Sequence, residues 1–190
     1  MASTAVPDTR DRILRTTLDL IGREGISAVT NRSVAAAAGV SLGSLTYHFE
    51  SQLDLVRESL LLFVGEEVKR LEGIAEDLRR RRPSVEQVAE EVERIVRESS
   101  KRIPQLAETE LHLRAARDPE LQDASRSCFE AYEDVAEAAL ALLQVPEPAV
   151  HARSIVALMY GAMLRRLGTG DEDASGLADA LLTIVRGATR

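Results

Sequence analysis

The sequence contains no tryptophan, and aromatic residues make up only 3% of its 190 residues. The hydrophobic core must therefore come from Leu, Val, Ile and Ala, which favours helices over a β-sandwich. The single cysteine, Cys128, excludes a disulfide within the chain and fits a reducing compartment. The longest uncharged apolar stretch, 154–164, is too short to cross a membrane, and residues 1–10 carry no apolar segment of a signal peptide. We therefore expect a cytoplasmic protein that does not contact the membrane.

Basic residues are fewer than acidic residues, 24 against 31, so the net charge is −7. This balance argues against wholesale coating of nucleic acid. The charge is unevenly distributed, because residues 1–50 contain five arginines and five acids, and the remaining chain carries the whole acidic excess. A neutral N-terminal region on an acidic body permits a local contact with DNA.

Apolar residues recur with helical spacing along the whole chain, and no stretch alternates for long enough to predict a strand. Glycines, prolines and capping residues divide the pattern into segments. The predicted helices cover residues 9–24, 31–38, 42–48, 52–80, 84–101, 104–117, 119–143, 147–168 and 172–187. The sequence thus predicts an all-α protein, a bundle of about nine helices with short connections.

Residues 31–48 combine a helix of about eight residues, a turn containing Gly39 and a short second helix, which is the pattern of a helix-turn-helix. Thr30 and Ser41 are expected to cap the two helices, and Gly39 can adopt the positive φ that the turn needs. The second helix carries hydroxyls and a tyrosine that suit phosphates and groove edges, and Arg32 is the one guanidinium nearby. Two short helices around a glycine also occur in proteins that bind no DNA, so the spacing alone leaves both interpretations open.

The segment from Thr30 to Phe49, with the run AAGVS followed by LGSLTYHF, resembles the DNA-binding signature of the tetracycline-repressor (TetR) family. The helix before it and the run LDLV at 53–56 extend the resemblance to residues 9–56. The resemblance implies an all-helical, homodimeric regulator. It also implies two domains, a helix-turn-helix in residues 1–50 and a ligand-sensing and dimerisation domain in residues 51–190.

The resemblance implies a set of residues that contact operator DNA: Thr30, Asn31, Arg32, Leu42, Gly43, Ser44, Thr46, Tyr47, His48 and Gln52. Within this set, Leu42, Gly43 and Thr46 would face bases in the major groove. Ser44, Tyr47 and His48 would hold the DNA backbone. Two positions depart from the family pattern, because the family often has Tyr at Thr46 and Lys at Gln52. The second departure removes one charge that would contact a phosphate.

Residues after the N-terminal region are candidates for an effector site: Glu110, His112, Phe129, Tyr132 and Met159. Phe129 and Tyr132 share a helix face and could line a pocket for a flat or apolar molecule, although they suit an ordinary core as well. Glu110 or His112 could orient a ligand in an apolar cavity, or could lie on the surface or in the core. Glu108 and His112 have the i,i+4 spacing of metal ligands, but no second segment completes the set. We therefore expect neither a metal nor a cofactor.

The last two predicted helices are strongly apolar, so they must be buried against the rest of the subunit or against a second copy. The resemblance favours the second copy. The candidate residues of this dimer interface are Ile155, Met159, Ala162, Leu177, Leu181 and Ile184.

The run Arg79–Arg82 ends the fourth predicted helix. We interpret it as complementing the helix dipole at a solvated corner, with binding of nucleic acid or anionic lipid as the alternative.

These observations predict a ligand-responsive transcriptional regulator, a repressor released from a pseudopalindromic DNA operator by a small-molecule effector. The alternatives are a small-molecule enzyme built on a helical bundle and an adaptor that binds only protein. No pairing of a nucleophile with a base and no metal cluster in the sequence supports the enzyme.

Overall fold

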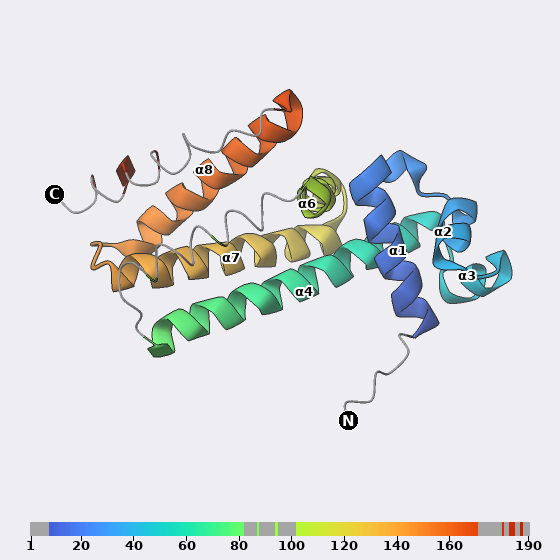
Figure 1. The fold of residues 1–190 in the computed structure, drawn as a ribbon, viewed down its shortest axis with the longest axis horizontal. Coiled ribbons are helices and arrows are strands. Elements are labelled where there is room, and N and C mark those ends of the chain that lie inside the picture. The colour runs from blue at the N-terminus through green and yellow to red at the C-terminus, as the bar shows by residue number, and fades with distance from the viewer. Residues whose placement is uncertain are drawn as a thin grey trace. The chain divides into compact units, whose positions relative to one another are not determined.

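The computed structural model describes residues 8–81, residues 102–170 and the single positions 87, 94, 180, 183, 184 and 187. In this part of the chain the regular elements are all helices, which confirms the predicted all-α class (Figure 1). The α-helices are α1 (Thr9–Glu24), α2 (Asn31–Ala38), α3 (Leu42–His48), α4 (Gln52–Arg81), α6 (Arg102–Ala115), α7 (Pro119–Leu142) and α8 (Pro148–Thr169), and a 3₁₀ turn, η1, covers Ile26–Ala28. The helices predicted over 84–101 and 172–187 lie largely outside the described residues. No described helix combines the length and the apolar character needed to cross a membrane.

The chain divides into two compact units. Unit 1 contains Met1–Phe63 and Arg102–Leu121, and unit 2 contains Val64–Lys101 and Gln122–Arg190. Unit 1 therefore adds α6 and the beginning of α4 to the three N-terminal helices. The expected division of function at residue 50 remains a prediction.

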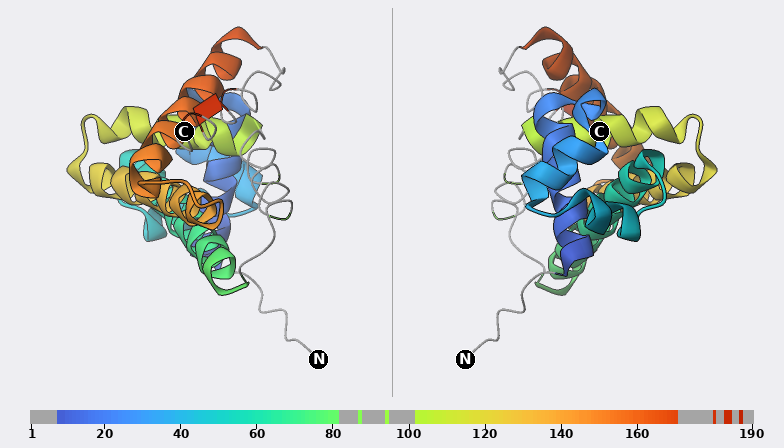
Figure 2. Two further views of the ribbon diagram at one scale, coloured as in Figure 1. Left: turned by 90° about the vertical axis from the view of Figure 1, so that its left-hand side faces the viewer. Right: turned by 90° about the vertical axis from the view of Figure 1, so that its right-hand side faces the viewer.

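The core of unit 1 forms around one face of α1, which packs against α2 and α6. Ile13, Leu14, Thr17 and Ile21 are buried at helical spacing along this face. The hydroxyl of Thr17 is satisfied inside the core, because it donates to the carbonyl of Ile13 at 2.9 Å. Figure 2 shows α2 and α3 in light blue beside the dark blue α1.

The turn between α2 and α3 follows the local rules that predict it. Thr30 and Ser33 form a capping box at the start of α2, and the Thr30 Oγ1 accepts from the Ser33 N–H at 3.0 Å. Gly39 ends α2 with φ 65° and ψ 38°, the left-handed conformation that glycine adopts at little cost. The Ser41 hydroxyl caps α3 by accepting from the Ser44 N–H at 3.0 Å. The helix bounds, the caps and the turn in this segment are confirmed.

In unit 2 the later part of α4 lies beside α7, and α8 packs on α7 (Figure 1). The buried positions of α4 and α7 in this unit are aliphatic residues and alanines, together with Tyr132 and the fully buried Cys128. Leu140, Val145 and Ala152 form a small apolar cluster where α7 turns into α8.

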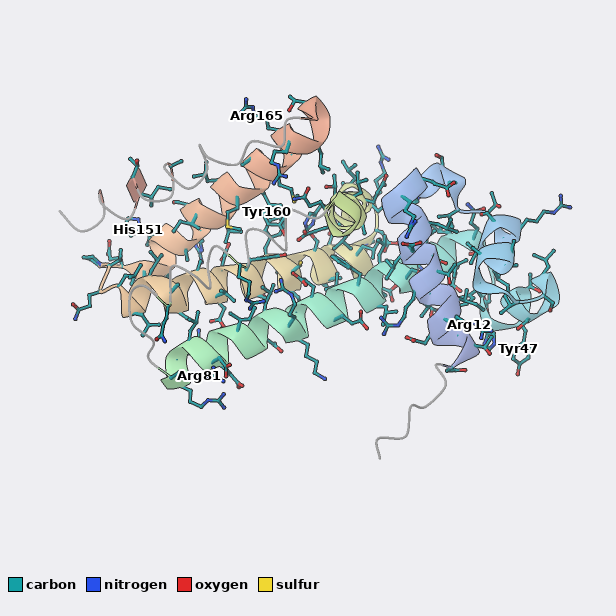
Figure 3. The ribbon with its side chains drawn as sticks, in the orientation of Figure 1. Arg12, Tyr47, Arg81, His151, Tyr160 and Arg165 are labelled. Atoms are coloured by element: carbon teal, nitrogen blue, oxygen red, sulfur yellow. The ribbon has the colours of Figure 1, made fainter. Side chains whose placement is uncertain are left out.

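The arginines that end α4 in unit 2 face carboxylates. Arg79 bonds to Asp134, and both Arg80 and Arg81 pair with Asp77. Figure 3 labels Arg81 at this end of the helix. Arg82 lies outside the described residues. Because the described arginines already have acidic partners, the contacts agree with the interpretation as a solvated helix end.

Candidate nucleic-acid interface and effector site

The outer surface of α3 carries large side chains that nothing in unit 1 covers. Leu42 is 46% exposed and Tyr47 is 85% exposed, and Gly43 and Thr46 are exposed between them. Figure 3 shows the Tyr47 side chain projecting away from the helices. Exposed apolar and aromatic side chains of this size mark a surface that meets another molecule.

Several polar side chains of α3 already make contacts within the helix. The Thr46 hydroxyl lies 3.2 Å from the carbonyls of both Leu42 and Gly43, so its hydrogen is used within the helix while its oxygen can still accept. The half-buried His48 ring meets the Tyr47 ring edge-on, at a centroid distance of 5.3 Å. Ser44 is half-buried under the cap from Ser41. The surface therefore offers shape and neutral hydrogen-bonding groups rather than charge.

Helix α2 directly precedes α3 in the sequence and packs against it. Thr30 is engaged in its capping box, whereas the Arg32 side chain is exposed and has no ion-pair partner among the described residues. The half-buried Asn31 has a side-chain oxygen that is shielded from solvent without a hydrogen-bond partner in the described chain. Arg32 is therefore an exposed guanidinium on the helix that packs against α3.

Two internal contacts near this surface were not indicated by the sequence. The side-chain amide nitrogen of Gln52 donates to the Val29 carbonyl, which ties the start of α4 to the loop before α2. Arg10 pairs with Glu58 and lies 5.5 Å from the centroid of the Phe49 ring. Gln52 therefore has a structural contact in addition to the DNA contact expected of it, and Arg10 is held inside unit 1.

The candidate effector residues of unit 2 surround Tyr160, a residue that the sequence analysis missed. The Phe129 and Tyr160 ring centroids lie 4.6 Å apart, and Tyr132 meets Tyr160 edge-on at 5.9 Å. Figure 3 shows Tyr160 projecting from α8 toward α7. Met159, the residue before it, is half-buried. Three of the chain's six Phe and Tyr residues thus form one aromatic cluster. The cluster exists because α8 packs on α7.

A half-buried carboxylate borders this aromatic cluster. The Tyr132 hydroxyl donates to Glu67 at 2.7 Å, and Arg70 donates to the same carboxylate through two nitrogens at 2.9 and 2.6 Å. Burial acts to raise the pKa of Glu67, but the hydrogen bonds from Arg70 and Tyr132 outweigh it, so the pKa is lowered from its ordinary value of 4.5. Glu67 is therefore an ionised group whose charge Arg70 balances.

The other two effector candidates, Glu110 and His112, belong to unit 1. Glu110 lines a groove of about 680 Å³ whose walls are Leu53, Arg57, Glu110, Leu113, Arg114, Arg117, Asp118, Pro119 and Leu121. His112 is absent from this lining and half-buried, and burial lowers its pKa from 6.5 to about 4. Glu108 is buried on the same helix, and the described residues contain no group of three His, Cys, Asp or Glu side chains suited to a metal ion.

The residues expected at the dimer interface occupy mixed positions. Ile155 is half-buried and packs on the Leu140–Val145–Ala152 cluster of its own subunit. Met159, Ala162 and Ile184 are also half-buried, while Leu177 and Leu181 lie outside the described residues. A neighbouring face of α8 is exposed instead, and it carries the apolar or small residues Val150, Ser154, Ala157, Gly161, Leu164 and Gly168. We call these six residues the α8 stripe. Their spacing alternates between four and three, as in helices that pack along one seam.

Two family models match the chain. Residues 13–58 match the model described as "Bacterial regulatory proteins, tetR family", and residues 83–190 match "Tetracyclin repressor-like, C-terminal domain". The two matches together cover both the helix-turn-helix and the larger C-terminal part.

Individual proteins are similar over different lengths. The crystal structure of SCO7518 from Streptomyces coelicolor A3(2) is 30% identical, with a TM-score of 0.66, and covers 97% of this chain and 100% of its own. The multidrug binding protein EbrR, crystallised with imidazole, is 28% identical, with a TM-score of 0.63, over 94% of this chain and 96% of EbrR. Other EbrR crystals contain ethidium, proflavin or malachite green.

One curated relative is the HTH-type transcriptional regulator YerO of Bacillus subtilis (strain 168), which is itself uncharacterized. It is 28% identical over 71 residues, which are 37% of this chain and 25% of YerO. The similarity thus spans a quarter of that relative's length.

Proposed function

The chain belongs to the TetR family of bacterial regulatory proteins, and from this premise we propose that it is a cytoplasmic repressor released from its DNA operator by a small molecule. The observation that carries the proposal is the uncovered outer surface of α3, where Leu42 and Tyr47 are exposed beside Arg32. A helix of this kind fits the major groove of B-DNA.

The residues of this surface divide into two roles. Leu42, Gly43 and Thr46 face base edges, where Leu42 suits a thymine methyl and the Thr46 oxygen accepts from a base. Arg32 reaches a guanine or a phosphate from the start of α2. Neutral groups hold the DNA backbone, namely those of Thr30, Asn31, Ser44, Tyr47, His48 and Gln52. Of these, Thr30 and Gln52 also serve contacts inside the protein.

The active form is proposed to be a homodimer on a pseudopalindromic operator, with two α3 helices about 34–36 Å apart in successive major grooves. The exposed α8 stripe supports this assembly, because small and apolar residues at alternating spacings of three and four allow two helices to approach closely. The half-buried Ile155, Met159, Ala162 and Ile184 would flank the stripe, together with the expected Leu177 and Leu181.

The effector is proposed to be a flat aromatic molecule that binds among Phe129, Tyr132 and Tyr160. These rings already pack in tilted and edge-on arrangements, which an inserted ring can extend. EbrR, a relative of similar length, is a multidrug binding protein crystallised with the flat aromatic molecules ethidium and proflavin, which supports the same class of effector here. The Met159 side chain can adapt to ligands of different shape. Effector and operator then weaken each other's binding reciprocally.

Selection of duplexes from a random pool by the full chain tests the proposal. We expect one enriched pseudopalindrome, with affinity lost in the Tyr47→Ala and Arg32→Ala variants. Arg23→Ala is the matched control, because Arg23 is an exposed arginine of the same unit that pairs with Asp19 at the end of α1. No enrichment at moderate salt, or equal losses in Arg23→Ala, would contradict DNA recognition by this surface.

A further inference from the structure

The groove of unit 1 has no part in the proposed operator contacts or in the aromatic effector cluster. One wall comes from Leu53 and Arg57 in the first turns of α4, and the other comes from the end of α6 and the turn into α7. Its volume of about 680 Å³ lies within the range of sites that take small organic molecules.

The α6 wall is built by helical periodicity. Glu110, Leu113 and Arg114 lie at i, i+3 and i+4 on one face of α6. Arg117 follows in the turn after the helix, where its N–H donates to the Arg114 carbonyl at 2.8 Å. Leu113 is 63% exposed, and Leu53 on the opposite wall is 55% exposed. Two large apolar side chains thus face open space within one groove, where an apolar ligand chain would cover them.

Some charged side chains of the groove form ion pairs and others do not. Arg57 donates to Asp118 at 2.9 Å and also lies 3.5 Å from Glu120, and its hydrogen bond lowers the pKa of Asp118. Arg57 and Asp118 are therefore already engaged with each other.

The remaining charged wall residues are Arg114, Arg117 and Glu110, and none of the three has an ion-pair partner among the described residues. The Nε of Arg114 is also shielded from solvent without an acceptor in that part of the chain. The residues that line the groove thus include three arginines and two carboxylates, so the lining carries one positive charge in excess beside its apolar surface. A buried donor without an acceptor is costly, and an anionic oxygen would satisfy it.

We propose that this groove is a second small-molecule site, which binds an amphipathic carboxylate with its head on Arg114 and Arg117 and its apolar chain across Leu53 and Leu113. The buried Leu121 side chain adds to the apolar wall. The site is independent of the proposed repressor function, because all its residues belong to unit 1 and none is assigned to DNA or to the aromatic cluster.

Isothermal titration calorimetry of the full chain with decanoate tests the proposal, with decyltrimethylammonium as a probe of equal chain length and opposite charge. We expect one decanoate site per chain and at least tenfold weaker binding of the cation. Arg114→Gln should weaken decanoate binding at least tenfold, since it removes a charge-assisted hydrogen bond. Leu113→Ser should weaken it at least threefold.

Two further variants provide a second test of the head-group contact and a control. Arg117→Gln changes an exposed side chain, so it tests the head-group contact even if Arg114→Gln unfolds, which circular dichroism reports. Arg23→Gln removes an exposed arginine elsewhere in unit 1 and should change decanoate affinity less than twofold. Equal binding of the cation, or unchanged decanoate affinity in Arg117→Gln and Leu113→Ser, would overturn the site. Loss of decanoate binding in Tyr160→Ala alone would also overturn it, by placing the anion in the aromatic cluster.

Discussion

The hydroxyl of Tyr132 on α7 donates a 2.7 Å hydrogen bond to Glu67 on α4, a residue 65 positions earlier in the chain. Together with Arg70 it holds the Glu67 carboxylate in its ionised form despite burial, so the pKa of Glu67 lies below its ordinary value of 4.5. The bond joins two helices of unit 2 beside the aromatic rings of the proposed effector site.

Tyr132→Phe should lower the free energy of unfolding at pH 7 by about 1.5 kcal/mol, because a hydrogen bond to a charged acceptor is lost while Arg70 remains. A carboxylate with a lowered pKa stabilises the folded state above its unfolded pKa, and this stability is lost as the pH falls through the folded pKa. The difference between wild type and Tyr132→Phe should therefore shrink below pH 4.5. Urea denaturation at pH 7 and at pH 3 measures both values.

Tyr47→Phe provides the control, because Tyr47 is exposed and its hydroxyl should contribute less than about 0.5 kcal/mol to stability. A Tyr132→Phe variant that is destabilised equally at pH 7 and pH 3 would show that the bond does not depend on the charge of Glu67.

The half-buried His112 should make the free energy of unfolding depend on pH in a second, higher pH range. Burial lowers its folded pKa to about 4, whereas the unfolded chain binds the proton near 6.5. The unfolded state therefore gains protons first, and stability should fall as the pH drops from 6.5 toward 4. The loss should reach about 3 kcal/mol at most, the free energy that corresponds to this pKa difference.

His112→Gln should remove this part of the pH dependence, as measured by urea denaturation at several pH values. His151→Gln, which removes a histidine of α8, should retain the wild-type slope between pH 6.5 and 4. Titration of His112 by NMR gives an independent check, and a folded pKa near 6.5 would refute the prediction.

The N-terminal helices could be predicted from the sequence because their signals are local. Thr30, Gly39 and Ser41 act within a few residues of their own positions, and the structure places the ends of α2 and the start of α3 where these signals predict them. Caps and left-handed glycines determine where a short helix begins and ends almost without reference to the rest of the fold. The spacing alone does not show whether this segment binds DNA, and only the resemblance to the TetR family implies that it does.

The contacts that the sequence could not predict all join distant segments. Tyr160 belongs to the aromatic cluster only because α8 packs on α7, and Gln52 is tied to Val29 only because α4 starts beside the loop before α2. Periodicity shows which helix face is apolar but not which helix it meets. The sequence pattern likewise does not show that Glu110 lines a groove of unit 1, whereas the aromatic candidates belong to unit 2.

Salt should weaken operator binding only moderately, because few arginines of the interface are available to phosphates. Arg10 is held by Glu58 and Phe49, whereas Arg12 and Arg32 are exposed without an ion-pair partner in the described chain (Figure 3 labels Arg12). We expect Arg12, at the start of α1, to reach a phosphate in addition to the neutral groups that hold the DNA backbone. Two such groups in each protomer give about four in a dimer, so log affinity against log salt should have a slope no steeper than about −4. Titrations of the selected operator at several salt concentrations measure the slope.

Arg12→Gln should make this slope shallower by about 2 in the dimer, since two phosphate contacts are lost. Arg23→Gln should leave it unchanged. A wild-type slope near −10 would mean that other cations reach the duplex, with Arg79, Arg80 and Arg81 as the first candidates despite their acidic partners.

The α8 stripe gives a test of assembly that does not disturb the core. Leu164 is 60% exposed in the single chain, so Leu164→Glu should leave the subunit folded and change its stability by less than about 0.5 kcal/mol. In a dimer joined through the stripe, the same change places a carboxylate in an apolar seam opposite its own copy, where it is costly to bury. Sedimentation should then give 20.8 kDa for the variant and twice that mass for the wild type.

Leu42→Glu is the control, because it alters an exposed leucine of α3 and should lose operator binding while remaining dimeric. If Leu164→Glu still sediments as a dimer, the subunits meet through a different face.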